Sequence, residues 1–186
     1  DAMLRDANLS FPSLLQSLRG LAAEASQCIL DLYAVLGELV VSQKSDASPV
    51  TEADHASHRL ICEVLQRLTP DVPILSEEST LEQLIGRRDW PRCWMIDPLD
   101  GTKEFIDGTG EFTVNIALVE AGIPVMGVVY VPAKQELFVG VLEGEHACAM
   151  RTVQTENSSQ QYSHWQHKEH PEHSKLTLYP VAGPAV

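Results

Sequence analysis

Apolar residues recur every three or four positions through the first part of the chain. Leucine, alanine and isoleucine side chains at this spacing predict a helix from about Ser13 to Leu36. A second helix is expected to open at Thr51, which would cap it, and to stop before Pro70. A short strand at 39–41 is expected between the two helices.

After the second helix the pattern changes to short apolar runs separated by turn residues, which predicts strands. A helical turn at 81–85 and a short helix at 103–106, capped by Thr102, are expected among them. Two helices followed by a meander predict an α+β fold, with the helices packed on a mainly antiparallel sheet. The strands are expected at 72–75, 93–96, 112–119, 125–131 and 136–142.

The apolar pattern fades near Arg151, which divides the chain into two parts. We expect one domain over residues 1–150 and an atypical, poorly packed tail over 151–186. Histidines recur every third position in this tail, but polar neighbours and Pro171 favour a solvated segment over a zinc site.

Composition narrows the classes of partner. The chain has 186 residues and a net charge of −13, and 44% of its residues are hydrophobic. This length and apolar content are sufficient for a folded core. The negative charge repels nucleic-acid polymers and anionic membranes, so we expect neither as a direct partner. An anionic substrate would need a metal ion or a local cationic patch.

Processing signals and cysteines point to the cytoplasm. The four cysteines form no C-x-x-C pair, which is typical of reduced thiols in a cytoplasmic protein. The N-terminus lacks the basic and apolar regions of a signal peptide, and the apolar stretch 122–133 is too short for a membrane span. The sequence opens with Asp1, from which we expect partial coverage of a longer protein.

Acidic residues gather at the ends of three predicted elements: Asp54, the pair Glu77–Glu78, and the pair Asp97–Asp100. A buried strand would deliver Asp97 to a sheet edge, where Pro98 would keep it extended. Asp100 would follow in the turn, so that both carboxylates face one point.

Such a cluster is typical of a magnesium site. Carboxylates that share a site repel one another unless cations lie between them, and Mg²⁺ prefers oxygen ligands. Gly101 permits close backbone approach, and the amides of Gly101 and Thr102 would point at an anion. The acidic chain would thus bind metal, and the metal would bind phosphate. The alternatives are a plain helix cap for Thr51 and Asp54, and a solvated surface position for Glu78.

The run Asp97-Pro98-Leu99-Asp100-Gly101-Thr102 resembles the inositol monophosphatase superfamily. Leu75-Ser76-Glu77-Glu78 upstream and Gly110-Glu111-Phe112-Thr113-Val114-Asn115 downstream strengthen the resemblance. The continuation Lys103-Glu104-Phe105-Ile106 and the segment 46–54 are most similar to its CysQ branch, the 3'(2'),5'-bisphosphate nucleotidases. The resemblance covers roughly residues 13 to 145 and implies a sugar-phosphatase-like N-terminal domain.

The resemblance implies Mg²⁺-dependent hydrolysis of a phosphomonoester, such as adenosine 3',5'-bisphosphate to AMP and phosphate. One Mg²⁺ would be held by Glu77, Asp97 and the carbonyl of Leu99, and a second by Asp97 and Asp100. Thr102 with Asp54 would activate the attacking water, and Glu78 would support that water or an outer metal. The implied substrate-binding set is Glu77, Leu99, Asp100, Gly101 and Thr102.

Family members also have a second α/β domain, whose Trp-Asp motif completes the second metal site. No Asp follows Asp107 here, so we expect that domain to be missing or truncated. The alternatives are therefore activity on another sugar phosphate, or an inactive metal-binding module. Apolar strands over 112–142 would expose surface and favour a homodimer or aggregation. Bacterial members are cytoplasmic, some at the inner face of the membrane.

Overall fold

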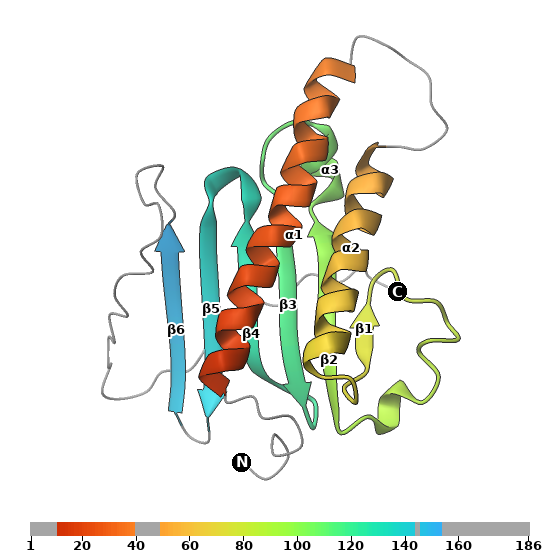
Figure 1. Ribbon diagram of the computed structural model, residues 1–186, viewed down its shortest axis with the longest axis vertical. Helices are drawn as coiled ribbons and strands as arrows, with labels where there is room; N and C mark the ends of the chain where they lie inside the picture. The colour runs from red at the N-terminus through yellow and green to blue at the C-terminus, as the bar shows by residue number, and fades with distance from the viewer. Residues whose placement is uncertain (1–10, 40–48, 144–145, 154–186) are drawn as a thin grey trace, which may run out of the picture.

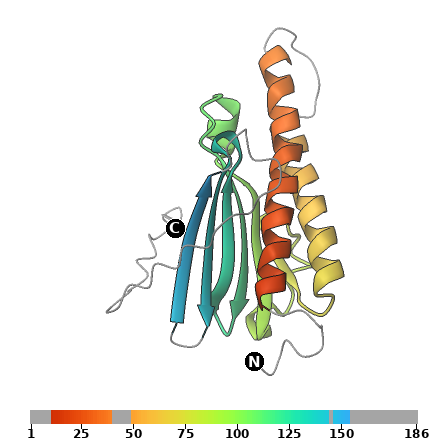
Figure 2. The ribbon, with the colours of Figure 1, turned by 60° about the vertical axis from the view of Figure 1, so that its left-hand side comes forward.

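The computed structural model describes residues 11–39, 49–143 and 146–153. Two long helices lie side by side across one face of a sheet, so the described part of the chain has two layers (Figures 1 and 2). The helices are α1 (Phe11–Leu39), α2 (Pro49–Leu68) and the short α3 (Thr102–Ile106), with 3-10 turns η1 (Arg87–Asp89) and η2 (Pro132–Lys134). No helix in these described ranges is both long enough and apolar enough to cross a membrane.

Six strands form a single sheet within the described residues, and their order in the sheet follows their order in the chain. The β1–β2 pair is parallel and every other pair is antiparallel. The predicted α+β fold, with helices packed on a mainly antiparallel sheet, is confirmed. The strands are β1 (Ile74–Ser76), β2 (Arg92–Asp100), β3 (Thr113–Glu120), β4 (Ile123–Val131), β5 (Glu136–Glu143) and β6 (His146–Val153).

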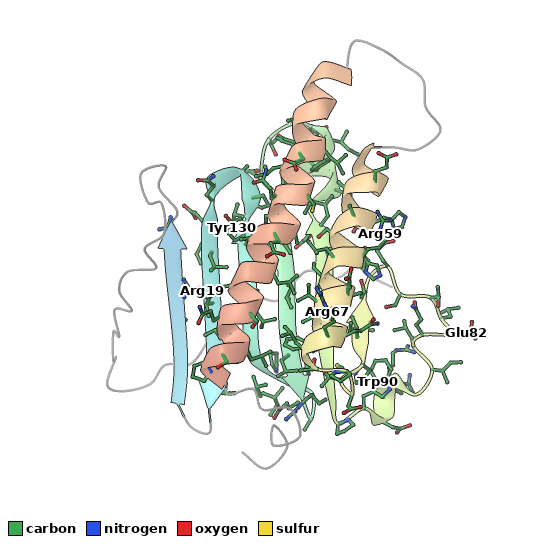
Figure 3. All side chains as sticks on the ribbon, viewed as in Figure 1. Arg19, Arg59, Arg67, Glu82, Trp90 and Tyr130 are labelled. Carbon is green, nitrogen blue, oxygen red and sulfur yellow. The ribbon has the colours of Figure 1, made fainter. Side chains whose placement is uncertain are left out.

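The core lies between the two long helices and the sheet, where their side chains meet (Figure 3). Leu18 and Ile29 of α1 and Ile61 of α2 are fully buried. Trp94 of β2 is also fully buried, and its Nε1 donates a hydrogen bond of 2.8 Å to Thr69 Oγ1 beyond the end of α2. Burial of each such side chain contributes about 1.5–3 kcal/mol, so this seam holds the helices against the strands.

Three aromatic rings connect α1 to α3 at one end of the molecule. Tyr33 lies 5.1 Å from Phe105 and 5.1 Å from Phe112, and the two phenylalanines lie 5.2 Å apart, all between ring centroids. Tilted and edge-on pairs at this distance are favourable. The cluster therefore fixes α3 and the start of β3 against the core.

Several local expectations were wrong. Helix α2 begins at Pro49, so Thr51 lies inside the helix and does not cap it; proline, with its fixed φ and missing N–H, suits the first helical position. Gly101, with φ 92°, is the N-cap of α3, and no side chain caps that helix, so Thr102 is its first residue. Strand β6 was not predicted. The tail expected over 151–186 lies outside the described residues from residue 154 onward, and the boundary at residue 150 stays a prediction. Of the strand expected at 39–41, Leu39 belongs to α1 and the rest lies outside the described residues.

The second face of the sheet is covered by no helix of the described residues (Figure 2). Large apolar side chains on β2, β4 and β5 remain partly exposed there: Met95 (48%), Val129 (39%) and Phe138 (38%).

Candidate metal centre

The predicted carboxylates come together because β1 and β2 end, and α2 begins, at the same edge of the sheet. Strands β1 and β2 are parallel, with Ser76 paired to Ile96, so Glu77 and Asp97 follow at the same level. In Figure 1 the arrows of β1 and β2 point toward the end of the molecule where α2 begins. Asp54 lies near this beginning of α2.

Hydrogen bonds from buried side chains hold these elements together. Ser57 of α2 is fully buried, and its Oγ donates to the Pro98 carbonyl at 2.9 Å. His58 Nδ1 lies 3.0 Å from Ser76 Oγ at the end of β1. Ser57 and His58 follow Asp54 within about one helical turn. The helix that carries Asp54 is thus tied to both acidic strand ends.

A bulge in β2 determines the face of the sheet from which the side chains of Asp97 and Asp100 project. Asp97 pairs with Asn115 and Asp100 pairs with Thr113, so two residues of β2 oppose one residue of β3 between these pairs. Residues three apart on a regular strand point to opposite faces. The extra residue returns Asp100 to the same face as Asp97. We predicted a turn at Asp100, but β2 continues to this residue.

Burial and mutual repulsion perturb two of the carboxyl groups. Burial, the charge of Glu78 and a hydrogen bond with Glu78 raise the pKa of Asp54 to about 7, and Asp97 and Glu77 add to the shift. Burial, and then the charges of Asp100 and Glu77, raise the pKa of Asp97 to about 6. A hydrogen bond from the Leu99 backbone acts in the opposite direction and lowers this pKa. Asp54 and Asp97 therefore lie within electrostatic range of each other and of Glu77 and Glu78, and Asp97 also lies within range of Asp100.

Three oxygen atoms in this cluster are buried and have no hydrogen-bond partner among the described residues: Asp54 Oδ1, Asp97 Oδ1 and Asn115 Oδ1. A buried acceptor without a donor is costly, and a cation would satisfy it. Within the described ranges, however, no three His, Cys, Asp or Glu side chains are arranged to hold a metal ion. Mg²⁺ usually takes one or two carboxylates and completes its shell with water and phosphate oxygens. The orphaned oxygens fit a cation of this open kind.

The backbone after Asp100 turns sharply at Gly101. A Cβ at this position would lie 2.8 Å from the Glu111 carbonyl oxygen and 3.2 Å from Phe112 Cα, and φ is 92°. Both the space and the dihedral angle therefore require glycine. Leu99 is buried and Thr102 is exposed. The roles assigned to Leu99, Gly101 and Thr102 stay predictions.

Other features near the cluster were not singled out from the sequence. His55 Nδ1 lies 3.5 Å from Glu78 Oε2, and Asn115 Nδ2 donates to Asp100 Oδ2 at 3.1 Å. The alternation of apolar and polar residues along β3 is a sequence signal that places residue 115 on the face away from the core. The sequence does not show which residue of β2 lies opposite it, because that depends on the register of the two strands. A hollow lined by Leu81 and residues 84–89 lies on the loop that Glu82 and Trp90 mark in Figure 3, and none of the clustered carboxylates lines it.

The sequence is similar to known proteins of one family. A sequence model of the Inositol monophosphatase family matches residues 13–179. The 3'(2'),5'-bisphosphate nucleotidase CysQ of Salmonella typhimurium is 48% identical over 125 residues, which is 67% of this chain and 50% of that protein. The protein of the same name from Escherichia coli K12 is 47% identical over the same shares.

Solved structures give the same picture. CysQ from Bacteroides thetaiotaomicron, described as a bacterial member of the inositol monophosphatase family, aligns with a TM-score of 0.63 and 41% identity. The alignment covers 78% of this chain and 52% of that one. An inositol monophosphatase from Zymomonas mobilis aligns with a TM-score of 0.60 and 31% identity, and the alignment covers 78% of this chain and 53% of that one. The chain thus spans about half the length of the relatives it matches.

Proposed function

The chain belongs to the inositol monophosphatase family, and from this premise we propose that it takes part in metal-dependent hydrolysis of a phosphomonoester. The observation that carries the proposal is the cluster of five carboxyl groups at one sheet edge, with buried oxygens that lack partners. Adenosine 3',5'-bisphosphate, converted to AMP and phosphate, is the proposed substrate, because two relatives that are 48% and 47% identical are named 3'(2'),5'-bisphosphate nucleotidase CysQ.

In this proposal Glu77, Asp97 and the Leu99 carbonyl hold one Mg²⁺, and Asp97 with Asp100 holds a second. When bound, Mg²⁺ would neutralise phosphate charge and stabilise the entering and leaving oxygens of an in-line displacement. The orphaned Asp97 oxygen supports this assignment, because it needs a cation or a donor.

Asp54 is the proposed proton acceptor. Its pKa of about 7 leaves a large ionised fraction near neutral pH and still permits protonation, which suits a general base. Asp54, together with the Thr102 hydroxyl, would take a proton from the attacking water. Glu78 would support that water or an outer metal. The backbone amides of Gly101 and Thr102 would receive the phosphate, with Glu77, Leu99 and Asp100 around it.

The test is release of inorganic phosphate from adenosine 3',5'-bisphosphate by the purified chain with Mg²⁺. Substitution of a residue that only supports a metal ligand typically lowers activity by roughly 10–100-fold. We expect Asp97→Asn to lower activity by more than this, because Asp97 would bind the metal itself. Asp107→Asn is the matched control, because Asp107 is an exposed aspartate outside the cluster. Equal activity of the Asp97→Asn variant and the parent chain would contradict the proposal.

Two other outcomes separate the alternatives. Faster turnover of an inositol phosphate or fructose bisphosphate would move the proposal to another sugar phosphate. A folded chain that binds Mg²⁺ but releases no phosphate would identify a metal-binding module.

We further propose a cytoplasmic location. Cys28, Cys62 and Cys93 are free thiols, and burial raises the pKa of Cys62 and Cys93, which keeps them protonated.

A further inference from the structure

Asn115 of β3 lies beside the acidic cluster. It is the cross-strand partner of Asp97. Its neighbours Val114 and Ile116 are buried against the helices, as is Ile96 beside Asp97. Side chains alternate along a strand, so Asn115 and Asp97 both project from the other face. Opposed residues have Cβ atoms about 4.5–5.5 Å apart, which brings the amide next to the carboxylate.

The amide of Asn115 has a definite orientation. Its Nδ2 donates a hydrogen bond of 3.1 Å to Asp100 Oδ2. The reverse orientation would place the amide oxygen against a carboxylate oxygen, and neither atom can donate. Asn115 Oδ1 is therefore turned away from Asp100 Oδ2.

Two acceptors beside the bulge are left over. Asn115 Oδ1 and Asp97 Oδ1 are both buried and have no hydrogen-bond partner in the described part of the chain. The bulge places Asp100 on the same face, so Asn115 lies opposite one carboxylate and is hydrogen-bonded to the other.

We propose that Asn115 is a positioning residue that holds the Asp100 carboxylate across the bulge, so that Asp97 and Asp100 bind a divalent cation together. The hydrogen bond occupies Asp100 Oδ2 with a donor and limits the rotation of the carboxylate. Asp100 is exposed, so nothing else in the described part of the chain prevents its carboxylate from rotating. Without this hydrogen bond, repulsion between Asp97 and Asp100 would turn the Asp100 carboxylate outward to water. This inference rests on the proposed function, since it assigns a role within the same cation site.

The test measures binding of Mn²⁺ to the full chain by electron paramagnetic resonance of the free ion, because Mn²⁺ also prefers oxygen ligands. We expect Asn115→Ala to weaken binding by about 10–100-fold, the usual effect of removing a partner of a metal ligand. Val129→Ala is the matched control: Val129 pairs with Asn115 on the neighbouring strand and carries no polar group. It should bind Mn²⁺ like the parent chain.

A second readout does not depend on the folding of a variant. The side-chain amide signals of Asn115 in a ¹H–¹⁵N spectrum, assigned by amide-selective labelling, should shift when Mg²⁺ is added to the parent chain. Unchanged signals at a Mg²⁺ concentration that saturates the site would overturn the inference.

The outcomes also separate this inference from the proposed function. If the parent chain binds no Mn²⁺, the metal-dependent function and this inference both fail. If the parent chain binds Mn²⁺, Asp97→Asn does not, and Asn115→Ala binds as tightly as the parent, the function stands and the role of Asn115 is wrong.

Discussion

At the scale of single residues, the most unusual groups are Asp54 and Asp97, whose pKa values are about 7 and about 6. Burial accounts for the largest part of each shift, and neighbouring carboxylates add to it. Both groups therefore favour the protonated form more strongly in the folded chain than in the unfolded chain. This arrangement opposes folding at neutral pH and favours a cation among the carboxylates.

A pH dependence of stability follows from these raised pKa values. The contribution of both groups is fully present below the unfolded pKa of about 3.8, and it is lost as pH rises through about 6 and 7. We expect the melting temperature of the metal-free chain to fall between pH 5 and pH 8, measured by circular dichroism with a chelator present.

The matched control is Asp54→Asn, which imitates the protonated carboxyl at every pH. Its melting temperature should fall less between pH 5 and pH 8. The same decrease in both proteins would show that Asp54 is not linked to stability in this range.

At the scale of elements, the site depends on the connection between α2 and the bulged part of β2. The hydrogen bond from Ser57 to the Pro98 carbonyl joins residues 41 positions apart in the chain. Ser57 and Pro98 are both buried, so water cannot replace the donor easily. The contact holds the helix of Asp54 against the strand of Asp97 and Asp100.

Ser57→Ala removes this donor and leaves the Pro98 carbonyl buried without a partner. We expect a loss of about 1–3 kcal/mol in the free energy of unfolding, measured by urea denaturation. Ser17→Ala is the matched control, since Ser17 is partly exposed on α1 and its Oγ donates to the Ser13 carbonyl of its own helix. It should change stability by no more than about 0.5 kcal/mol. Equal effects of the two substitutions would contradict a special role for Ser57.

At the scale of the whole molecule, one side of the sheet carries the helices and the other carries partly exposed apolar side chains. Val129 and Phe138 are directly paired across β4 and β5, and both are more than a third exposed. Contiguous apolar surface of this kind promotes association. The homodimer expected from the sequence stays a prediction, and this face is where we place it.

Val129→Lys introduces a charge into this face and should reduce self-association, measured by sedimentation velocity. Ile85→Lys is the matched control, because Ile85 is 74% exposed on the loop after β1. Association that decreases with Ile85→Lys and not with Val129→Lys would assign the contact to the loop.

The local pattern of the chain determined the elements and the chemistry that they carry. Helical spacing of apolar residues identified both long helices to within a few residues, because burial of one helix face leaves a periodic trace in the sequence. The acidic residues at strand ends could be named as candidates in the same way. Helix starts were less accurate, as at Thr51 and Thr102, because several neighbouring residues can satisfy the first backbone amides. The division of the chain at residue 150 stays a prediction.

Only the tertiary structure decided which of those residues meet. The faces of Asp97 and Asp100 depend on a bulge, and a bulge is defined by pairing with β3 and not by the residues of β2 alone. Asn115 and Ser57 acquire their partners from strand register and helix packing in the same way. Strand β6 forms along β5, which supplies its hydrogen bonds, although its own residues give a weak signal. Such contacts join positions far apart in the chain, and periodicity within a short window carries no information about them.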